Sequence, residues 1–330
     1  MKKLDLFLLA TGIAAFIIYF IFFIDVQSVS RTLSSANQPI VVTILFLSVL
    51  DVACFAFAFK TLIEMASSRL TFKKAWKYVW CSTFIDIIIP GETVSGEISR
   101  IYFLSRYENI PSYKTTNSVL WQRAIGMVTT SIMFTFSSLF LIFGPFAYFV
   151  WFMTCCSWAF SALVCLYCVK PAWIAKTTQP IVAILIRLKR QSLATSLSDY
   201  ANKLATSMPH QSRGKLSLAI TMQSISWACA LVLEYLSFVA LGYTPSMQVI
   251  LFVHSFLLAV KLPIGPSMEF GISDLTMVGL FSFFLVPTVL AIAATIIIRF
   301  ATLWFRLVIG FAAYTMLGKG KPVDFSFDKL

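Results

Sequence analysis

The chain has 330 residues, of which 59% are hydrophobic and only 12% charged, and its formal net charge is +12. About a quarter of the residues in a soluble domain are charged, so this chain lacks the polar surface that a soluble globule of its size needs. Its apolar runs are long and continuous rather than alternating, which favours membrane-spanning helices over a β-barrel. We therefore expect an all-α polytopic protein of the cell membrane. The basic residues lie between the apolar runs, where topology and anionic headgroups explain them without a nucleic-acid partner.

The apolar runs predict about six full membrane spans. The first, Leu4–Ile24, follows two lysines and is too long for the core of a signal peptide, so we expect a retained helix and a cytoplasmic N-terminus. Each of the six runs is long enough to cross a hydrocarbon core of about 30 Å. The other five are Ile40–Ile63, Ser118–Phe143, Ala147–Val169, Leu216–Leu241 and Pro287–Leu317. Together they predict one transmembrane domain, residues 1–317, and a short cytoplasmic tail, residues 318–330.

Two further apolar stretches are too short or too broken to cross. Tyr78–Pro90 is followed by the amphipathic Glu92–Tyr107, and Met247–Leu262 is followed by a second apolar piece, Ile272–Leu285. The helix-breaking residues in these stretches are Pro90, Gly91, Gly96, Pro263, Gly265, Pro266 and Gly271. If both stretches turn back to the side they entered, most of the 26 Lys and Arg residues lie in the cytoplasm. The sequence thus predicts two re-entrant helical hairpins that open to opposite sides, as an inverted repeat would place them.

The longest polar insertion, Lys170–Lys215, contains eight basic residues. Its pieces Ile181–Leu188 and Leu193–Met208 have apolar residues at helical spacing, which favours an amphipathic helix on the inner leaflet. A solvated linker is the alternative.

Charged residues follow each of the two helix breaks. Glu97 and Arg100 follow the first, with Arg123 in the next span; Glu269 and Asp274 follow the second, with Arg299 in the last span. Charges at membrane depth are costly, so these six side chains are expected to pair or to line a polar cavity. Glu97 to Arg123 is 26 positions and Asp274 to Arg299 is 25, a similarity that internal duplication would leave.

Each of these charges also has a structural interpretation. Glu97 could begin a surface helix, and Arg299 could form a structural ion pair with Asp274 or Glu269. Arg306 lies seven positions after Arg299, which predicts that both arginines share one helix face and that Arg306 reaches the headgroups. The charges that remain without an assigned partner are Asp51, Asp86, Glu234 and Lys261.

Enzyme signatures are absent from the sequence. His210 and His254 are the only histidines, and no phosphate-binding loop, nucleotide fingerprint or nucleophile elbow is present. The sequence therefore predicts no enzyme activity, cofactor or metal.

The run Pro90-Gly91…Gly96-Glu97-x-x-Arg100-x-x-x-Leu104, followed by Arg123, resembles the transmembrane region of lysylphosphatidylglycerol synthases. The second Pro/Gly-rich break, Pro263–Asp274 with Arg299, is similar to the second motif of that family. The chain departs from the family at Asp274, where Glu is usual, at Pro266-Ser267, which replaces Gly-Gly, and at Gln122, where an acid is common.

The resemblance implies a stand-alone lipid-handling membrane protein without the synthase domain. The leading hypothesis is a flippase-like transporter for a phospholipid or a polyprenyl-phosphate-linked lipid. Its path would be lined by Glu97, Arg100, Arg123, Glu269, Asp274 and Arg299. The alternatives are a non-catalytic anchor that recruits a synthase or glycosyltransferase through Lys170–Lys215, and an intramembrane transferase with a carboxylate-bound metal. The expected partners are membrane lipids, with a lipid-modifying enzyme and a homodimer left open.

Overall fold

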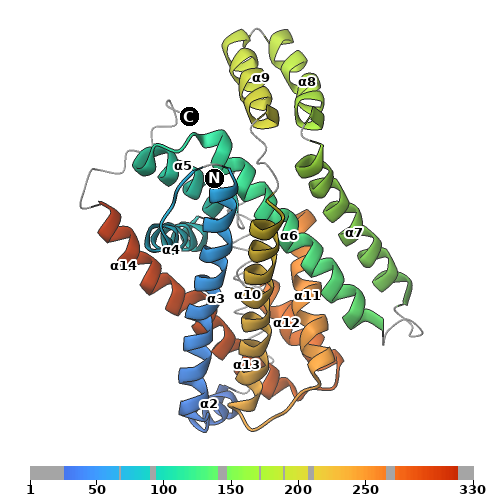
Figure 1. Ribbon diagram of the computed structural model, residues 1–330. Helices are drawn as coiled ribbons and strands as arrows, with labels where there is room; N and C mark the ends of the chain where they lie inside the picture. Colours follow the sequence, from blue (N-terminus) through green and yellow to red (C-terminus); the bar gives the residue numbers. More distant parts are fainter. Residues whose placement is uncertain are drawn as a thin grey trace.

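The computed structural model describes residues 26–66, 68–89, 94–139, 147–170, 172–188, 190–206, 212–264 and 272–318. All regular elements in these ranges are helical, and their order along the chain is visible in Figure 1. The N-terminal half contains α2 (Val26–Ser34), α3 (Gln38–Met65), α4 (Phe72–Ile88), α5 (Val94–Glu108), α6 (Ser112–Ser138) and α7 (Ala147–Val169). The C-terminal half contains α8 (Ala172–Arg187), α9 (Gln191–Thr206), α10 (Arg213–Val239), α11 (Met247–Ile264), α12 (Ile272–Phe283), α13 (Thr288–Arg299), the π-helical η3 (Phe300–Trp304) and α14 (Phe305–Gly318).

Four helices are long and apolar enough to cross a membrane: Gln38–Met65, Ala147–Val169, Arg213–Val239 and Thr288–Leu317. These confirm four of the predicted spans and the polytopic membrane class. The predicted span Leu4–Ile24 lies outside the described residues. The predicted span Ser118–Phe143 corresponds to α6, which begins six residues earlier, at Ser112. Because α6 contains polar residues, which include Lys114 and Arg123, its hydropathy does not place it among these four helices.

The two broken stretches are antiparallel helical hairpins. In the first, the start of α4 meets the end of α5, where Lys74 Nζ lies 2.7 Å from Glu108 Oε2. The other ends also meet, because Gly96 N donates to Asp86 Oδ1 at 3.0 Å. In the second hairpin, Phe252 near the start of α11 packs edge-on against Phe284, directly after α12. Both pairs therefore return the chain toward its starting end, the geometry that a re-entrant segment needs.

Gly96 and Pro263 do not break helices, contrary to the prediction. Gly96 lies in the first turn of α5, and α11 continues through Pro263 to Ile264. Gly96 serves close packing instead, because a Cβ there would lie 3.1 Å from the carbonyl oxygen of Ser82. The other predicted breaks, at Pro90, Gly91, Gly265, Pro266 and Gly271, lie outside the described residues.

Two buried clusters hold the bundle together. One joins α3, α4, α5 and α14 around the fully buried Trp80, Phe59 and Phe103. The other joins α2, α3 and α10 to α13 around Phe238 and Phe281. Since lipid tails are as apolar as these side chains, close packing and hydroxyl hydrogen bonds supply much of the helix association.

Serine hydroxyls link α6 to two neighbouring helices. Ser131 bonds Ser157 and Ser161 of α7 at 2.7 and 2.8 Å. Ser137 bonds Ser255 of α11 at 3.2 Å. These small side chains let the helices approach closely while satisfying buried hydroxyl groups. They hold α6 between α7 and α11, where its charged side chains meet α5.

The segment after α7 is a helical hairpin, α8–α9, that projects beyond the end of the bundle (Figure 1). The predicted amphipathic segment is thus two helices. Their contacts with the bundle include α6, where the Tyr200 and Thr116 hydroxyls lie 2.8 Å apart, and Tyr167 of α7. Exposed apolar side chains on α8 include Trp173, Ile181 and Ile184.

Candidate functional site

The first helix hairpin carries a carboxylate at its closed end. Asp86, in the last turn of α4, accepts hydrogen bonds from the Ser95 hydroxyl at 2.6 Å and from Gly96 N at 3.0 Å. The negative charge therefore sits at the positive N-terminal end of α5, where a carboxylate is stabilised. This contact fixes the direction of α5 and turns its next residues, Glu97 and Arg100, toward α6.

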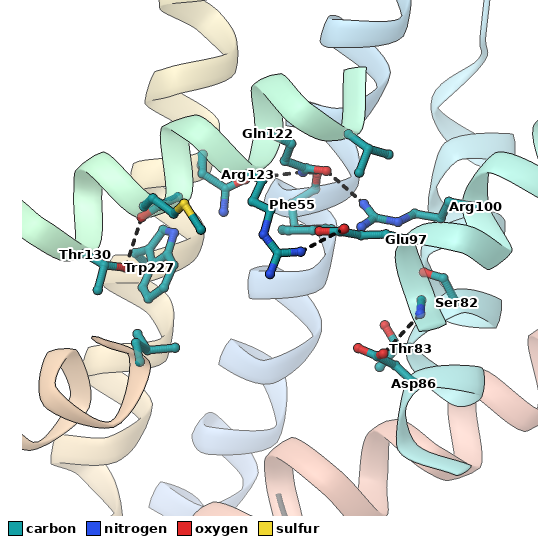
Figure 2. A pocket seen from close by; sticks show the side chains of 16 residues that line it. Phe55, Ser82, Thr83, Asp86, Glu97, Arg100, Gln122, Arg123, Thr130 and Trp227 are labelled. Atoms are coloured by element: carbon teal, nitrogen blue, oxygen red, sulfur yellow. Dashed lines mark hydrogen bonds and ion pairs between the residues drawn. The ribbon is translucent and has the colours of Figure 1, made fainter. Parts of the chain in front are cut away.

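Glu97 of α5 forms an ion pair with Arg123 of α6, with Oε2 and Nη1 2.9 Å apart (Figure 2). The side chains are only partly buried, at 18% and 27% exposed. Their other donor and acceptor atoms can therefore meet a ligand or solvent. The ion pair joins a charge of the first motif to one in the following helix.

Arg100, one turn after Glu97, is buried at 5% exposure. Its Nη1 donates to Gln122 Oε1 at 2.8 Å, and its guanidinium lies over the rings of Phe55 and Phe59, at 5.1 and 5.0 Å. Within the described ranges its Nε has no hydrogen-bond partner and no carboxylate forms an ion pair with it. A buried arginine that is held by an amide and two aromatic faces keeps donors available for an anion.

Gln122 organises the surroundings of Arg100. Its Nε2 donates to the Phe55 carbonyl at 3.1 Å and to Gln223 Oε1 of α10 at 3.3 Å. One amide thus ties α6 to α3, α5 and α10. In the sequence, Gln122 is notable only as a departure from the family pattern.

These side chains face a cavity of about 230 Å³ between α3, α4, α5, α6, α10 and α11. Figure 2 shows the charged groups of α5 and α6 on one side and Trp227 with Thr130 on the other. The cavity therefore joins a charged wall to a largely apolar one. Its lining comprises Phe55, Ser82, Thr83, Asp86, Gly96, Glu97, Arg100, Val119, Gln122, Arg123, Gly126, Met127, Thr130, Gln223, Trp227 and Leu258.

A second cavity, also about 230 Å³, adjoins the first and shares Phe55, Thr83 and Asp86 with it. Its charged end is formed by Arg306 of α14, whose Nη2 lies 2.6 Å from Asp51 Oδ2 of α3. Arg306 Nε also donates to the Ser48 hydroxyl at 2.9 Å. The prediction that Arg306 reaches the headgroups is therefore wrong, because it pairs with a carboxylate on a neighbouring helix. The sequence marked Asp51 as a costly charge but could not identify this partner, 255 positions away.

Arg299 and Arg306 do not share a face of one helix, contrary to the prediction. Arg299 contacts Asp274 and Ser273 of α12, whereas Arg306 contacts α3. The π-helical segment η3 lies between the two arginines and changes the number of residues per turn. The Ala301 carbonyl inside η3 accepts a hydrogen bond from the Ser48 hydroxyl at 2.8 Å, which ties this segment to α3.

The six predicted path residues do not form one cluster. Glu97, Arg100 and Arg123 line the first cavity. Asp274 and Arg299 pair with each other and are not among its lining residues. Glu269 lies outside the described residues. Of the charges without an assigned partner, Asp86 joins the first cavity and Glu234 pairs with His254. The structure does not describe the side chain of Lys261.

Within the described part of the chain, no three His, Cys, Asp or Glu side chains gather into a group that could hold a metal ion.

The comparisons with known proteins give one family and one relative. The family model described as lysylphosphatidylglycerol synthase TM region matches residues 7–310. A UPF0104 membrane protein of Methanocaldococcus jannaschii is 24% identical in an alignment over 316 residues that covers 92% of each chain. No solved structure matches the chain. The residues matched by the family model include both helical hairpins and all residues that line the first cavity. The chain therefore belongs to the lysylphosphatidylglycerol synthase TM region family.

Proposed function

We propose that this protein moves an anionic membrane lipid across the bilayer, with the phosphate of the headgroup passing the first cavity. The observation that carries the proposal is Arg100, a buried guanidinium that lines the cavity without an ion-pair partner among the described carboxylates. A phosphate oxygen could accept from its Nε and from Arg123 on the opposite helix. Arginine suits this role because its planar fork binds phosphate with two parallel hydrogen bonds.

The opposite wall of the cavity suits the remainder of a lipid. Trp227, Met127 and Leu258 present apolar surface there. A polar headgroup could thus travel beside α5 and α6 while its acyl chains stay in the hydrocarbon region. The two helical hairpins would provide the moving parts, as re-entrant segments do in inverted-repeat transporters.

The ion pair Glu97–Arg123 would act as a reversible competitor for the phosphate. A headgroup that binds Arg123 must either displace Glu97, 2.9 Å away, from the guanidinium or share the guanidinium with it. Binding therefore stays weak enough for release, which transport requires. No nucleotide site is needed for this step, so movement would follow a lipid or ion gradient.

The proposal is tested by reconstituting the purified full chain in vesicles with fluorescent analogues. The probes are labelled phosphatidylglycerol, phosphatidylethanolamine and a short polyprenyl phosphate, and dithionite quenching measures their transfer. Arg100→Ala should lower the initial rate of the transported probe roughly tenfold to a hundredfold, the loss of one or two charge-assisted hydrogen bonds. The matched control is Arg106→Ala, an exposed arginine of the same helix, which should transfer like the parent. Transfer no faster than in protein-free vesicles for all three probes would refute the proposal.

A second candidate function, a membrane anchor for a lipid-modifying enzyme, is favoured by the α8–α9 hairpin. It projects from the bundle and exposes Trp173, Ile181, Ile184, Ile186 and Leu188. Deleting residues 172–206 should then abolish co-purification of a synthase or glycosyltransferase. The anchor hypothesis requires that lipid transfer by the protein alone is absent, which separates it from the first proposal.

A further inference from the structure

Glu234 of α10 and His254 of α11 form a buried pair beside the cavity. His254 Nδ1 lies 2.6 Å from Glu234 Oε1, and the two side chains are only 11% and 10% exposed. Histidine is the side chain whose charge changes most readily near neutral pH. Because the Glu234 carboxylate contacts the ring directly, a change in the charge of His254 changes the electrostatic energy of the α10–α11 interface.

The remaining polar atoms of the pair are also buried. In the portion of the chain that the structure describes, His254 Nε2 and Glu234 Oε2 have no hydrogen-bond partner. Buried polar side chains that serve only to hold a fold normally satisfy such atoms. Here each residue keeps one atom that can take up or release a proton while the Nδ1–Oε1 contact persists.

The pair is joined to the cavity by Trp227. Its indole packs edge-on against the His254 ring, with centroids 5.5 Å apart and an interplanar angle of 88°. Trp227 itself lines the cavity, as does Leu258, one helical turn after His254 on α11. Trp227 forms part of the cavity wall (Figure 2), so a change in the position of the His254 ring moves that wall.

Among the described side chains, several charges of the neighbouring helices are already engaged with one another. On α3, Asp51 pairs with Arg306; on α6, Arg123 pairs with Glu97; and Asp274 of α12 pairs with Arg299 of α13. The apolar α7, residues 147–169, carries no Asp, Glu, Lys, Arg or His. The other titratable side chains on the inner turns of α10 are Cys229 and Tyr235.

We propose that Glu234 and His254 form a proton-binding site that couples lipid movement to proton movement. With a proton on His254, the imidazolium and the carboxylate neutralise each other and the pair is stable when buried. When that proton leaves, a single negative charge remains between α10 and α11, which favours separation of the helices and entry of water. The conformation in which the pair is closed is therefore the protonated one, and the cavity wall at Trp227 follows it.

The proton site is tested without any lipid substrate. The intrinsic fluorescence of the purified full chain in nanodiscs is recorded between pH 5 and 8, with Trp227→Phe subtracted to isolate Trp227. A protonated imidazole at edge contact quenches indole, so the difference signal should fall as the pH falls. His254→Gln should abolish the change, and Glu234→Gln should alter it, because this variant removes the carboxylate that contacts the ring. His210→Gln, a variant of the chain's other histidine, should titrate like the parent. A parental difference signal independent of pH, or one retained in His254→Gln, would overturn the proton site.

Coupling rests on the proposed lipid transport and is tested in the vesicle assay with an imposed pH gradient. In the parent, a gradient of one unit should change the initial rate several-fold, and the opposite gradient should change it in the opposite direction. Nigericin with potassium should remove the difference. Transfer by His254→Gln should no longer respond to the gradient, whereas His210→Gln should respond fully. If the parent transfers lipid at a rate that ignores the gradient, coupling is wrong while the transport proposal stands. If the parent moves no probe, the transport proposal and coupling fall together, and the fluorescence titration alone decides the proton site.

Discussion

Arg123 of α6 forms an ion pair with Glu97 of α5 across the side of the cavity, with Nη1 and Oε2 2.9 Å apart. Arg299 repeats this arrangement with Asp274 in the second half of the chain. In both halves the carboxylate lies in the first turn of the second hairpin helix, and the arginine lies in the long helix that follows. The offsets, 26 and 25 positions, are almost equal. This correspondence supports the predicted internal duplication by contacts rather than by sequence identity.

The first prediction concerns the strength of the Glu97–Arg123 contact. A double-mutant cycle with Glu97→Gln and Arg123→Gln should give a coupling of about 0.5–2 kcal/mol, because both side chains are partly shielded from solvent. The measurement is reversible unfolding of the full chain in mixed micelles. The comparison is the pair Lys74–Glu108, in which the lysine is 54% exposed and the glutamate 12% exposed; it should couple by less than about 1 kcal/mol. Equal coupling in the two pairs would show that the partial burial of Arg123 adds nothing.

The second prediction concerns Gly310, where α14 crosses α4. A Cβ at this position would lie 2.8 Å from the Trp80 carbonyl oxygen and 2.8 Å from Phe84 Cβ. Gly310→Ala should therefore force the helices apart and lower the free energy of unfolding by about 1–3 kcal/mol. Gly279→Ala on α12 is the control, since nothing lies within 4 Å of its Cβ, and it should be neutral or slightly stabilising because alanine favours helix. A thermal midpoint for Gly310→Ala at or above that of Gly279→Ala would contradict the close approach.

The third prediction concerns the amide that supports Arg100. Gln122→Leu would leave Arg100 Nη1, Gln223 Oε1 and the Phe55 carbonyl without this partner. We expect a loss of about 1–3 kcal/mol in unfolding free energy, the cost of leaving buried polar groups unsatisfied. Gln248→Leu replaces an exposed glutamine of α11 and should change stability by less than about 0.5 kcal/mol. The two variants are compared by the same micelle unfolding assay, and similar stabilities would remove Gln122 from its organising role.

Hydropathy alone predicted much of the fold. Continuous apolar runs place α3, α7, α10 and the α13–α14 helix, because a bilayer demands long segments with all backbone groups paired. The charge balance between loops predicted that the two broken stretches return on themselves, and Lys74–Glu108 and Gly96–Asp86 show this for the first hairpin. Such arguments work because they depend on local composition.

The contacts between distant helices could not be predicted in this way. Arg306 and Asp51 are 255 positions apart, and their meeting depends on the rotation of α14 about its axis. The π-helical segment Phe300–Trp304 alters that rotation. No apolar periodicity in the sequence predicts this segment. Glu234 and His254 are only 20 positions apart, but they lie on helices whose relative register is set by side-chain packing. The sequence indicates that each buried charge needs a partner, but it does not indicate which residue the partner is.

The last prediction uses the two equivalent ion pairs to separate fold from transport. In Glu97→Arg/Arg123→Glu, the ion pair is restored with reversed direction, and the same holds for Asp274→Arg/Arg299→Glu. Both double variants should regain most of the stability lost by either single change. The recovery should fall short by about 0.3–1 kcal/mol, because an arginine then occupies the first turn of α5 or α12, where the helix dipole favours a carboxylate.

The two swaps should differ in lipid transfer. Glu97 and Arg123 line the first cavity, so their exchange moves the positive charge from α6 to α5 and should slow transfer at least tenfold in spite of a restored fold. Asp274 and Arg299 do not line that cavity, so their exchange should keep transfer within about twofold of the parent. Both values come from the vesicle assay, with unfolding measured on the same preparations. Equal losses in the two swapped variants would mean that the second pair also meets the lipid, and the path would then run through both halves of the molecule.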